Sequence, residues 1–184
     1  YMHAMGNSCG GMKLYTNLED KYEKYQGGFI WDYIDQSIQI KNTQGEEVFT
    51  YGGDFDDRAT DYEFCGNGIV FADRKISPKS QEVKALYAPI RLTPDEYGVL
   101  IENRNNFIDT GCYYFVYRLL INGECVFEKA LDEIILPLDS KYVEVDIPQT
   151  GKEGEYVYEV SARLKEDTIW AKKGYEISFG QKAV

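Results

Sequence analysis

The pattern of apolar and polar residues changes near residue 90. Before it, short apolar runs such as Phe29-Ile30-Trp31 and Ile69-Val70-Phe71 are separated by amphipathic and polar stretches. After it, apolar and polar residues alternate with period 2. The first pattern is typical of α/β segments and the second of antiparallel sheets. We therefore predict an α/β segment over residues 1–90 and an all-β domain over residues 91–184.

In the first segment, the spacing predicts a helix from residue 7 or 8 to about residue 25, with its apolar stripe at Leu14, Leu18, Tyr22 and Tyr25. Residues 29–31 and 69–71 are predicted as short buried strands, Gln44-Gly45 as a turn, and Pro78 as the start of another helix. A helix followed by an apolar strand and then by polar residues is the rhythm of a parallel α/β unit. Such folds place their chemistry at the carboxyl end of a strand, here at Asp32, Tyr33, Asp35 and Gln36.

In the second segment, period-2 alternation predicts six or seven short strands. The clearest are residues 98–103, 112–121, 124–129, 143–147, 156–164 and 175–179. Asn122-Gly123 is a strong signal for a two-residue hairpin turn. Tyr156, Tyr158, Val160, Ala162 and Leu164 should share one face of their strand. Strands of this number and length favour an antiparallel β-sandwich.

Composition narrows the classes of partner. The net charge of −11 argues against nucleic acid and against an anionic membrane surface, because both attract basic proteins. No apolar run approaches the ~18 residues of a membrane span. The chain holds 16 tyrosines, which suit either a half-wet sugar-binding surface or simply the strands that favour tyrosine. Because the chain begins at Tyr1 rather than Met, we expect it to be a piece of a longer protein.

The four cysteines, Cys9, Cys65, Cys112 and Cys125, form no CxxC pair, and His3 is the only histidine, so we predict no structural zinc site. A turn at Asn122-Gly123 would place Cys125 opposite Leu120 and Cys112 opposite Glu133. The two thiols would then not meet. We therefore predict four reduced cysteines and a cytoplasmic location.

Before any family is considered, three features could carry chemistry. Trp31 beside carboxylates is either a platform for the apolar face of a sugar or a core residue next to solvated acids. The acidic loop at residues 53–63 departs from the EF-hand pattern at Arg58, which favours a solvated loop over a calcium site. His3 has no catalytic partner that the sequence identifies. Residues 90–184 contain no cluster of catalytic residue types and read as a supporting module.

Four motifs in order add a family resemblance. They are YMHAMGNSCGG at residues 1–11, GGFIWDYIDQSIQ at 27–39, YGGDFDD at 51–57 and FCGNGIVFADR at 64–74. Together they resemble the large multidomain bacterial β-galactosidases of glycoside hydrolase family 2. The second half, which ends in GYEISFGQ at 174–181, is similar to the Ig-like domain that follows the barrel in this family.

The resemblance implies a fold and an activity. Residues 1–90 would be the C-terminal part of a (β/α)8 TIM barrel, and residues 91–184 an Ig-like β-sandwich. The parent enzyme would hydrolyse terminal β-D-galactosides such as lactose with retention, which requires two carboxyl groups ~5–5.5 Å apart. In the family the nucleophilic Glu directly precedes the motif that begins here at Tyr1, and the acid/base Glu lies further upstream. The resemblance therefore implies no catalytic residue in this chain, and an inactive isolated fragment.

The resemblance also implies binding residues. His3 would bond galactosyl hydroxyls, and Trp31 would wall the galactose subsite. Asn67, through its side-chain oxygen, and Phe64, through its backbone carbonyl, would hold a sodium ion that meets the 6-hydroxyl of the sugar. The family's magnesium ligands lie beside the acid/base Glu and are absent from this chain. Expected partners are β-galactoside sugars, the remaining domains of the same enzyme and, for the full-length protein, further copies in a homo-oligomer.

One departure and one alternative remain. The family usually has Gly at the position of Asp56 in this chain. If the backbone there has a positive φ, Asp is one of the more tolerable replacements for Gly. The alternative function, from a different class, is a non-catalytic carbohydrate-binding or assembly module in which the tyrosine-rich sandwich is the working surface.

Overall fold

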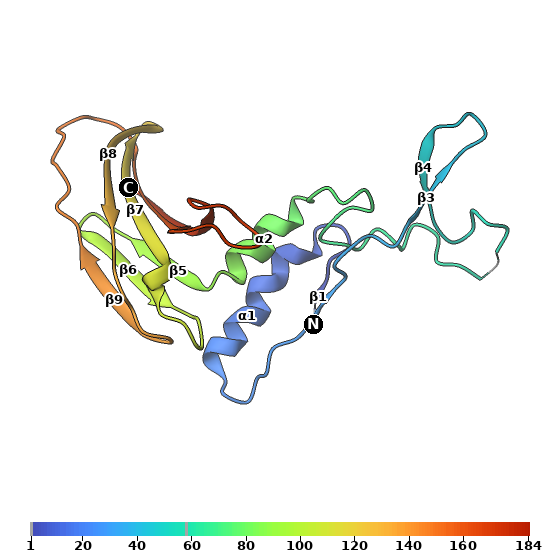
Figure 1. The fold of residues 1–184 in the computed structure, drawn as a ribbon, viewed down its shortest axis with the longest axis horizontal. Coiled ribbons are helices and arrows are strands. Elements are labelled where there is room, and N and C mark those ends of the chain that lie inside the picture. The colour runs from blue at the N-terminus through green and yellow to red at the C-terminus, as the bar shows by residue number, and fades with distance from the viewer. Residues whose placement is uncertain (1, 58) are drawn as a thin grey trace. The chain divides into compact units, whose positions relative to one another are not determined.

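The structure is a computed structural model that describes residues 2–57 and 59–184. The chain forms two units, Tyr1–Leu86 and Tyr87–Val184, each of which is described by itself (Figure 1). Within the described residues, strands predominate, α-helices are few, and every sheet is open.

The first unit opens with a β-α-β arrangement. Strand β1 (Met2–His3) pairs in parallel with β2 (Ile30–Trp31), and the 3₁₀ helix η1 (Ser8–Gly11) and helix α1 (Met12–Lys21) connect them. The Ala4 N–H extends the pairing by donating to the Trp31 carbonyl at 2.5 Å. The predicted parallel pairing of strands around a helix is therefore confirmed at this point of the chain.

The rest of the first unit is a hairpin, a long irregular stretch and one helix. Strands β3 (Ile38–Lys41) and β4 (Glu47–Thr50) pair antiparallel around the predicted turn, where Gly45 has φ +84°. Helix α2 (Lys79–Leu86) follows Pro78, as the sequence predicts. Figure 1 labels both helices and the β3–β4 hairpin.

Several predictions for the first unit are wrong. Residues 69–71 form no strand, because only Val70 makes bridges, one parallel to Ile34 and one antiparallel to Ile76. The buried face of α1 is Met12 and Thr16, whereas Leu14 of the predicted stripe is 72% exposed. The spacing of apolar residues along a helix shows which face is apolar. Whether that face is buried depends on which neighbouring element covers it.

The predicted burial of residues 29–31 is also wrong. Phe29 is 90% exposed and Trp31 is 56% exposed. The strand β2 has a neighbour, β1, along one edge, and the described residues of the unit do not cover the Phe29 and Trp31 side chains. A continuous apolar run is typical of a strand that is buried on both faces, but this burial requires other elements that cover both faces.

The second unit consists of two antiparallel sheets, with strand orders β11-β10-β7-β8 and β5-β6-β9. The strands are β5 (Ile90–Pro94), β6 (Gly98–Asn103), β7 (Tyr113–Ile121), β8 (Glu124–Leu131), β9 (Ser140–Glu144), β10 (Tyr156–Leu164) and β11 (Glu176–Ala183). A 3₁₀ helix η2 (Thr110–Cys112) precedes β7. The predicted bounds of β6 and β10 are confirmed residue for residue.

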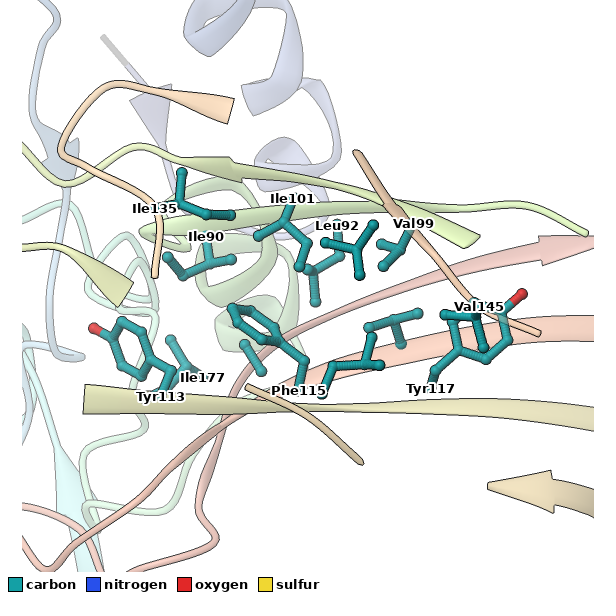
Figure 2. Packing of buried hydrophobic residues seen from close by; sticks show 14 of the residues in the cluster. Ile90, Leu92, Val99, Ile101, Tyr113, Phe115, Tyr117, Ile135, Val145 and Ile177 are labelled. Carbon is teal, nitrogen blue, oxygen red and sulfur yellow. The ribbon is translucent and has the colours of Figure 1, made fainter. Parts of the chain in front are cut away.

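Side chains from both sheets form one hydrophobic core. Figure 2 shows Leu92 and Ile101 of one sheet pointing toward Phe115 of the other. Ile101 and Phe115 have no solvent exposure, and neither does Val160 of β10. The predicted inward face of β10 is confirmed, because Val160, Ala162 and Leu164 belong to this core and Tyr158 packs against it.

The β7–β8 hairpin tests the cysteine prediction. Asn122 and Gly123 both have positive φ, +50° and +82°, as a type I′ turn requires. Leu120 pairs with Cys125 as predicted, but a bulge then shifts the register, so that Leu119 pairs with Phe127. Glu133 therefore does not lie opposite Cys112. The two thiols are not bonded, and all four cysteines are free, with Cys9 buried.

Candidate functional site

The strand pair β1–β2 brings His3 next to Trp31. The two residues are partners in the parallel register. The chain leaving β1 is held in place twice, because the Ala4 N–H donates to the Trp31 carbonyl and the Lys79 Nζ donates to the Ala4 carbonyl at 3.0 Å. Helix α2 thus fixes the exit of β1 and, with it, the position of the His3 side chain.

A second segment, residues 64–70, lies along the residues that follow Trp31. The Asp32 N–H donates to the Asn67 carbonyl at 2.9 Å, and the Ile69 N–H donates to the Asp32 carbonyl at 3.0 Å. The Val70 N–H continues this pairing with the Tyr33 carbonyl. Asn67 is therefore held beside the carboxyl end of β2, the edge at which the sequence predicts chemistry.

The orientation of His3 follows from its contacts. Its Nδ1 accepts a hydrogen bond from the Met5 N–H at 3.3 Å. A neutral ring that accepts at Nδ1 carries its proton on Nε2, which leaves Nε2–H as a donor. The ring also packs against Phe64, with centroids 5.4 Å apart and planes tilted by 49°. His3 and residues 64–67 therefore belong to one cluster.

Asn67 is the most unusual residue of this cluster. Its side chain is 1% exposed, and its Nδ2 donates to the Phe64 carbonyl at 3.2 Å. Its Oδ1 is buried and has no hydrogen-bond partner among the described residues. Leaving a buried acceptor unpaired costs about 1–3 kcal/mol, and such a group usually has a ligand, an ion or a water as its partner.

Trp31 is exposed within the described residues, which favours the platform interpretation over the core interpretation. Its relative exposure is 56%, and that of the neighbouring Tyr33 is 67%. Asp32 lies between them and accepts a hydrogen bond from the Gln36 Nε2 at 2.9 Å. A flat apolar ring beside hydrogen-bonding groups has the chemistry that a sugar ring needs.

The acidic loop at residues 53–63 binds its own backbone. The Asp57 Oδ1 accepts from the N–H groups of Gly53 and Phe55, at 2.9 and 3.3 Å, and these bonds, that of Gly53 first, hold the Asp57 pKa below its ordinary value. Asp56 has φ +58°, so the position does use the left-handed conformation. Among the described residues, no group of three or more His, Cys, Asp or Glu side chains could hold a metal ion.

The second unit carries an open groove of about 580 Å³ of its own. Its walls combine aromatic and acidic side chains, chiefly Tyr97, Tyr156 and Tyr158 with Glu96 and Asp146. The Tyr156 hydroxyl donates to the Lys152 carbonyl at 2.6 Å, which ties the 148–152 loop to β10 and forms one wall.

The structure also gives positioning roles to two residues: Asp35, which the sequence places among the candidates at the end of the strand, and Lys79, for which the sequence suggests no function. Lys79 holds the Ala4 carbonyl, and the Asp35 Oδ1 accepts from the Gly68 N–H at 2.7 Å. The sequence places Asp35 at the correct strand end, but its partner lies in a segment that sequence spacing does not connect to it. For Lys79 no sequence signal exists.

Within the part of the chain that the structure describes, no helix is long and apolar enough to cross a membrane.

Comparisons with known proteins add family evidence for both units. The family described as glycosyl hydrolases family 2, TIM barrel domain, matches residues 1–92, and the family described as β-galactosidase, domain 4, matches residues 99–184. A β-galactosidase of Halalkalibacterium halodurans is 54% identical over 98% of this chain and 18% of its own length. One of Clostridium acetobutylicum is 52% identical over 100% of this chain and 20% of its own length. A β-galactosidase large subunit of Leuconostoc lactis is 57% identical over 47% of this chain and 14% of its own length.

The chain thus spans about a fifth of the length of the first two relatives.

Proposed function

The chain belongs to glycosyl hydrolase family 2, and we propose that it supplies the galactose-binding wall of a retaining β-galactosidase that hydrolyses terminal β-D-galactosides such as lactose. The observation that carries the proposal is the cluster of His3, Trp31, Phe64 and Asn67, residues from three separate segments that lie together at one end of β2. Two other observations support it, the relatives named β-galactosidase and the exposure of Trp31.

Each residue of the wall has a distinct task in this proposal. The Trp31 ring packs against the apolar C–H face of the galactosyl ring. The His3 Nε2–H donates to a galactosyl hydroxyl, because its Nδ1 is already an acceptor for Met5. These contacts orient the anomeric carbon toward the two catalytic carboxyl groups. Both of these come from Glu residues outside this chain, and the chain alone is inactive.

Asn67 and the Phe64 carbonyl are the proposed sodium ligands, and Asn67 also takes part in substrate binding through the ion. The donor set consists of two oxygens of the kind that a hard cation prefers: the Asn67 Oδ1, which is buried and has no partner among the described residues, and the Phe64 carbonyl, to which the Asn67 Nδ2 donates at 3.2 Å. When bound, sodium would supply an electrostatic contact for the 6-hydroxyl of the sugar. The enzyme's magnesium ligands lie outside this chain.

The proposal includes the domain context. We assign residues 1–90 to the C-terminal segment of a glycoside hydrolase TIM barrel and residues 91–184 to an Ig-like β-sandwich. The parallel β1–β2 pair supports the first assignment, and the two antiparallel sheets with a shared core support the second. The partners are the remaining domains of the same enzyme, a homo-oligomer of the full-length protein and β-galactoside sugars, in the cytoplasm, without nucleic acid or membrane.

The test uses the full-length protein that contains this chain. Hydrolysis of a chromogenic β-galactoside is measured in sodium chloride and in choline chloride at equal ionic strength, and the anomer formed first is identified by proton NMR. The proposal predicts hydrolysis with retention of the β-anomer and a lower KM in sodium. Release of the α-anomer first, or identical kinetics in both salts, contradicts it.

The groove of the second unit favours one alternative, a non-catalytic carbohydrate-binding module. Tyrosine rings and carboxylates beside each other, as at Tyr97 and Glu96, suit a neutral polyol. Galactose titrated against the chain, with binding followed by calorimetry, separates the two functions. Binding that survives Trp31→Ala but is lost in Tyr97→Ala favours the module, and the opposite pattern favours the galactose-binding wall.

A further inference from the structure

We infer that Asp35 is a positioning residue for the buried amide side chain of Asn67, an inference that rests on the function proposed above. Asp35 does not touch the sugar in this arrangement. It acts through Gly68, whose N–H donates to the Asp35 Oδ1 at 2.7 Å in a partly buried position.

The hydrogen bond acts on one peptide unit. The carbonyl of Asn67 and the N–H of Gly68 belong to the same planar peptide group. Its carbonyl accepts from the Asp32 N–H at 2.9 Å, and its N–H donates to the Asp35 carboxylate. The stretch from Asp32 to Asp35 therefore holds this peptide plane at both ends and so fixes the direction in which the Asn67 side chain leaves the backbone.

Gly68 is what permits this close approach. A Cβ at this position would overlap the backbone of Ile34, Asp35 and Val70. Gly68 and Asn67 are both buried, so solvent is a poor substitute partner for the Gly68 N–H. Removing the carboxylate would leave a buried donor unpaired, and the loop would have to shift to hydrate it.

The neighbouring hydrogen bonds cannot replace this one. The pairs Ile69 with Asp32 and Val70 with Tyr33 are backbone bonds that hold the residues after Gly68. The Asp35 bond is the side-chain contact that the structure gives to the peptide between Asn67 and Gly68. A carboxylate accepting from a backbone N–H is roughly twice as strong as a neutral pair, which suits it to this task.

The geometry of Asn67 explains why such a support matters. Within the described residues its side chain makes one hydrogen bond, from Nδ2 to the Phe64 carbonyl at 3.2 Å, and its Oδ1 is left for a ligand. A rotation of the 67–68 peptide would turn the Asn67 side chain away from the Phe64 carbonyl that its Nδ2 holds, and the two proposed oxygen ligands would lose their relative placement. Residues that support metal ligands in this way typically alter metal affinity by about 10- to 100-fold when they are replaced.

The experiment compares three variants of the full-length protein: Asp35→Ala, Asp35→Asn and Asp73→Ala. Asp73 is the matched control, since its carboxylate also accepts a backbone N–H, that of Lys75 at 3.0 Å, but in a turn away from Asn67. Two quantities are measured. They are amide hydrogen exchange over residues 64–72 and the sodium concentration that gives half of the sodium-induced rise in the thermal midpoint.

Asp35→Ala is expected to accelerate exchange at Gly68 and to raise the half-saturating sodium concentration about 10- to 100-fold. Asp35→Asn keeps an acceptor oxygen, so its sodium requirement should stay within about threefold of the wild type. Asp73→Ala should change neither the amide exchange at residues 64–68 nor the sodium requirement. The inference is overturned if Asp35→Ala leaves Gly68 exchange or the sodium requirement unchanged, or if Asp35→Asn is as damaging as Asp35→Ala.

The wild-type protein separates this inference from the proposed function. If the wild type has no sodium response, the proposed sodium role fails, and the exchange at Gly68 with the KM for a galactoside decides the role of Asp35. If Asp35→Ala does not fold, Asp35→Leu takes its place, because leucine fills a similar volume without an acceptor: faster exchange at Gly68 supports the inference, and unchanged exchange contradicts it.

Discussion

His3 and Trp31 are register partners on the parallel strands β1 and β2, and the hydrogen bond from the Ala4 N–H to the Trp31 carbonyl continues that pairing. The pairing brings a hydrogen-bond donor and an exposed aromatic ring to one strand end. Residues 64–67 complete the cluster through the contact of Phe64 with the His3 ring. The proposed sugar-binding wall is thus built from three short segments, of which none is a complete site.

Trp31→Ala should raise the KM of the full-length protein for a β-galactoside by roughly tenfold, the equivalent of about 1.4 kcal/mol, because the sugar loses its aromatic platform. The matched control is Trp170→Ala. Trp170 is 63% exposed, packs edge-on against Tyr175 in the second unit, and has no proposed sugar contact. Steady-state kinetics of both variants check the prediction, and equal effects of the two changes would refute it.

Asn67→Leu should abolish the response to sodium, because leucine has a similar volume but no oxygen. Asn103→Leu is the control: Asn103 is also buried, but its Nδ2 donates to the carbonyls of Ile108, Ile135 and Leu136. Its loss should lower stability without changing the sodium requirement. Thermal midpoints across a sodium chloride series check both variants, and a sodium response retained in Asn67→Leu speaks against the assignment.

Asp95 and Tyr142 should make the stability of the second unit depend on pH. Burial raises the Asp95 pKa, but bonds from the Tyr142 hydroxyl and from the Tyr97 and Gly98 N–H groups outweigh it, so the pKa lies below its ordinary value. A lowered acid pKa contributes stability that is present above the unfolded value of about 3.9 and is lost as the pH falls below it. Asp95→Asn and Tyr142→Phe should both weaken this loss between about pH 5 and 3.

At alkaline pH, the stability of the second unit should fall as the pH rises, the opposite of its behaviour at acid pH. Burial, followed by the bond to Asp95, raises the pKa of Tyr142 to about 12. The phenol therefore contributes stability below an unfolded pKa of about 10 that is lost as the pH rises toward about 12. Unfolding midpoints of the second unit, followed by Trp170 fluorescence in a Trp31→Phe background, check both limbs. A variant that keeps the wild-type acid limb would contradict the role of Asp95.

Phe115→Ala should destabilise the second unit by about 3–5 kcal/mol, because Phe115 has no solvent exposure and lies between the two sheets. Phe179→Ala removes the same group from a side chain that is 55% exposed and should cost about 1 kcal/mol or less. Denaturant unfolding with the Trp170 probe measures both. Similar losses in the two variants would contradict the placement of the core.

The second unit was largely predictable because its information is local. Alternation fixed the faces of β6 and β10, and the positive φ angles of Asn122 and Gly123 match what the turn chemistry requires. The exception is the register of β7 and β8 beyond Leu120. There a bulge adds one residue, which the local sequence pattern does not predict. Cys112 consequently does not lie opposite Glu133.

The first unit was less predictable because its burial depends on distant partners. Leu14 and Phe29 have apolar side chains in apolar patterns, yet both are exposed within the described residues. Val70 makes bridges rather than a strand, because its neighbours are short irregular segments. The candidate site shows the same limit: the resemblance singled out Asn67, but its unpaired Oδ1 and its support from Asp35 required the three-dimensional arrangement.

The measurement that tests the central claim most directly is a parallel assay of the 184-residue chain and of the full-length protein on a chromogenic β-galactoside. The chain is proposed to supply the sugar wall but neither catalytic carboxyl group. The account predicts hydrolysis by the full-length protein, a roughly tenfold rise in its KM on Trp31→Ala, and no release of chromophore by the isolated chain above the buffer blank. Turnover by the isolated chain, or a full-length protein that leaves β-galactosides intact, would contradict it.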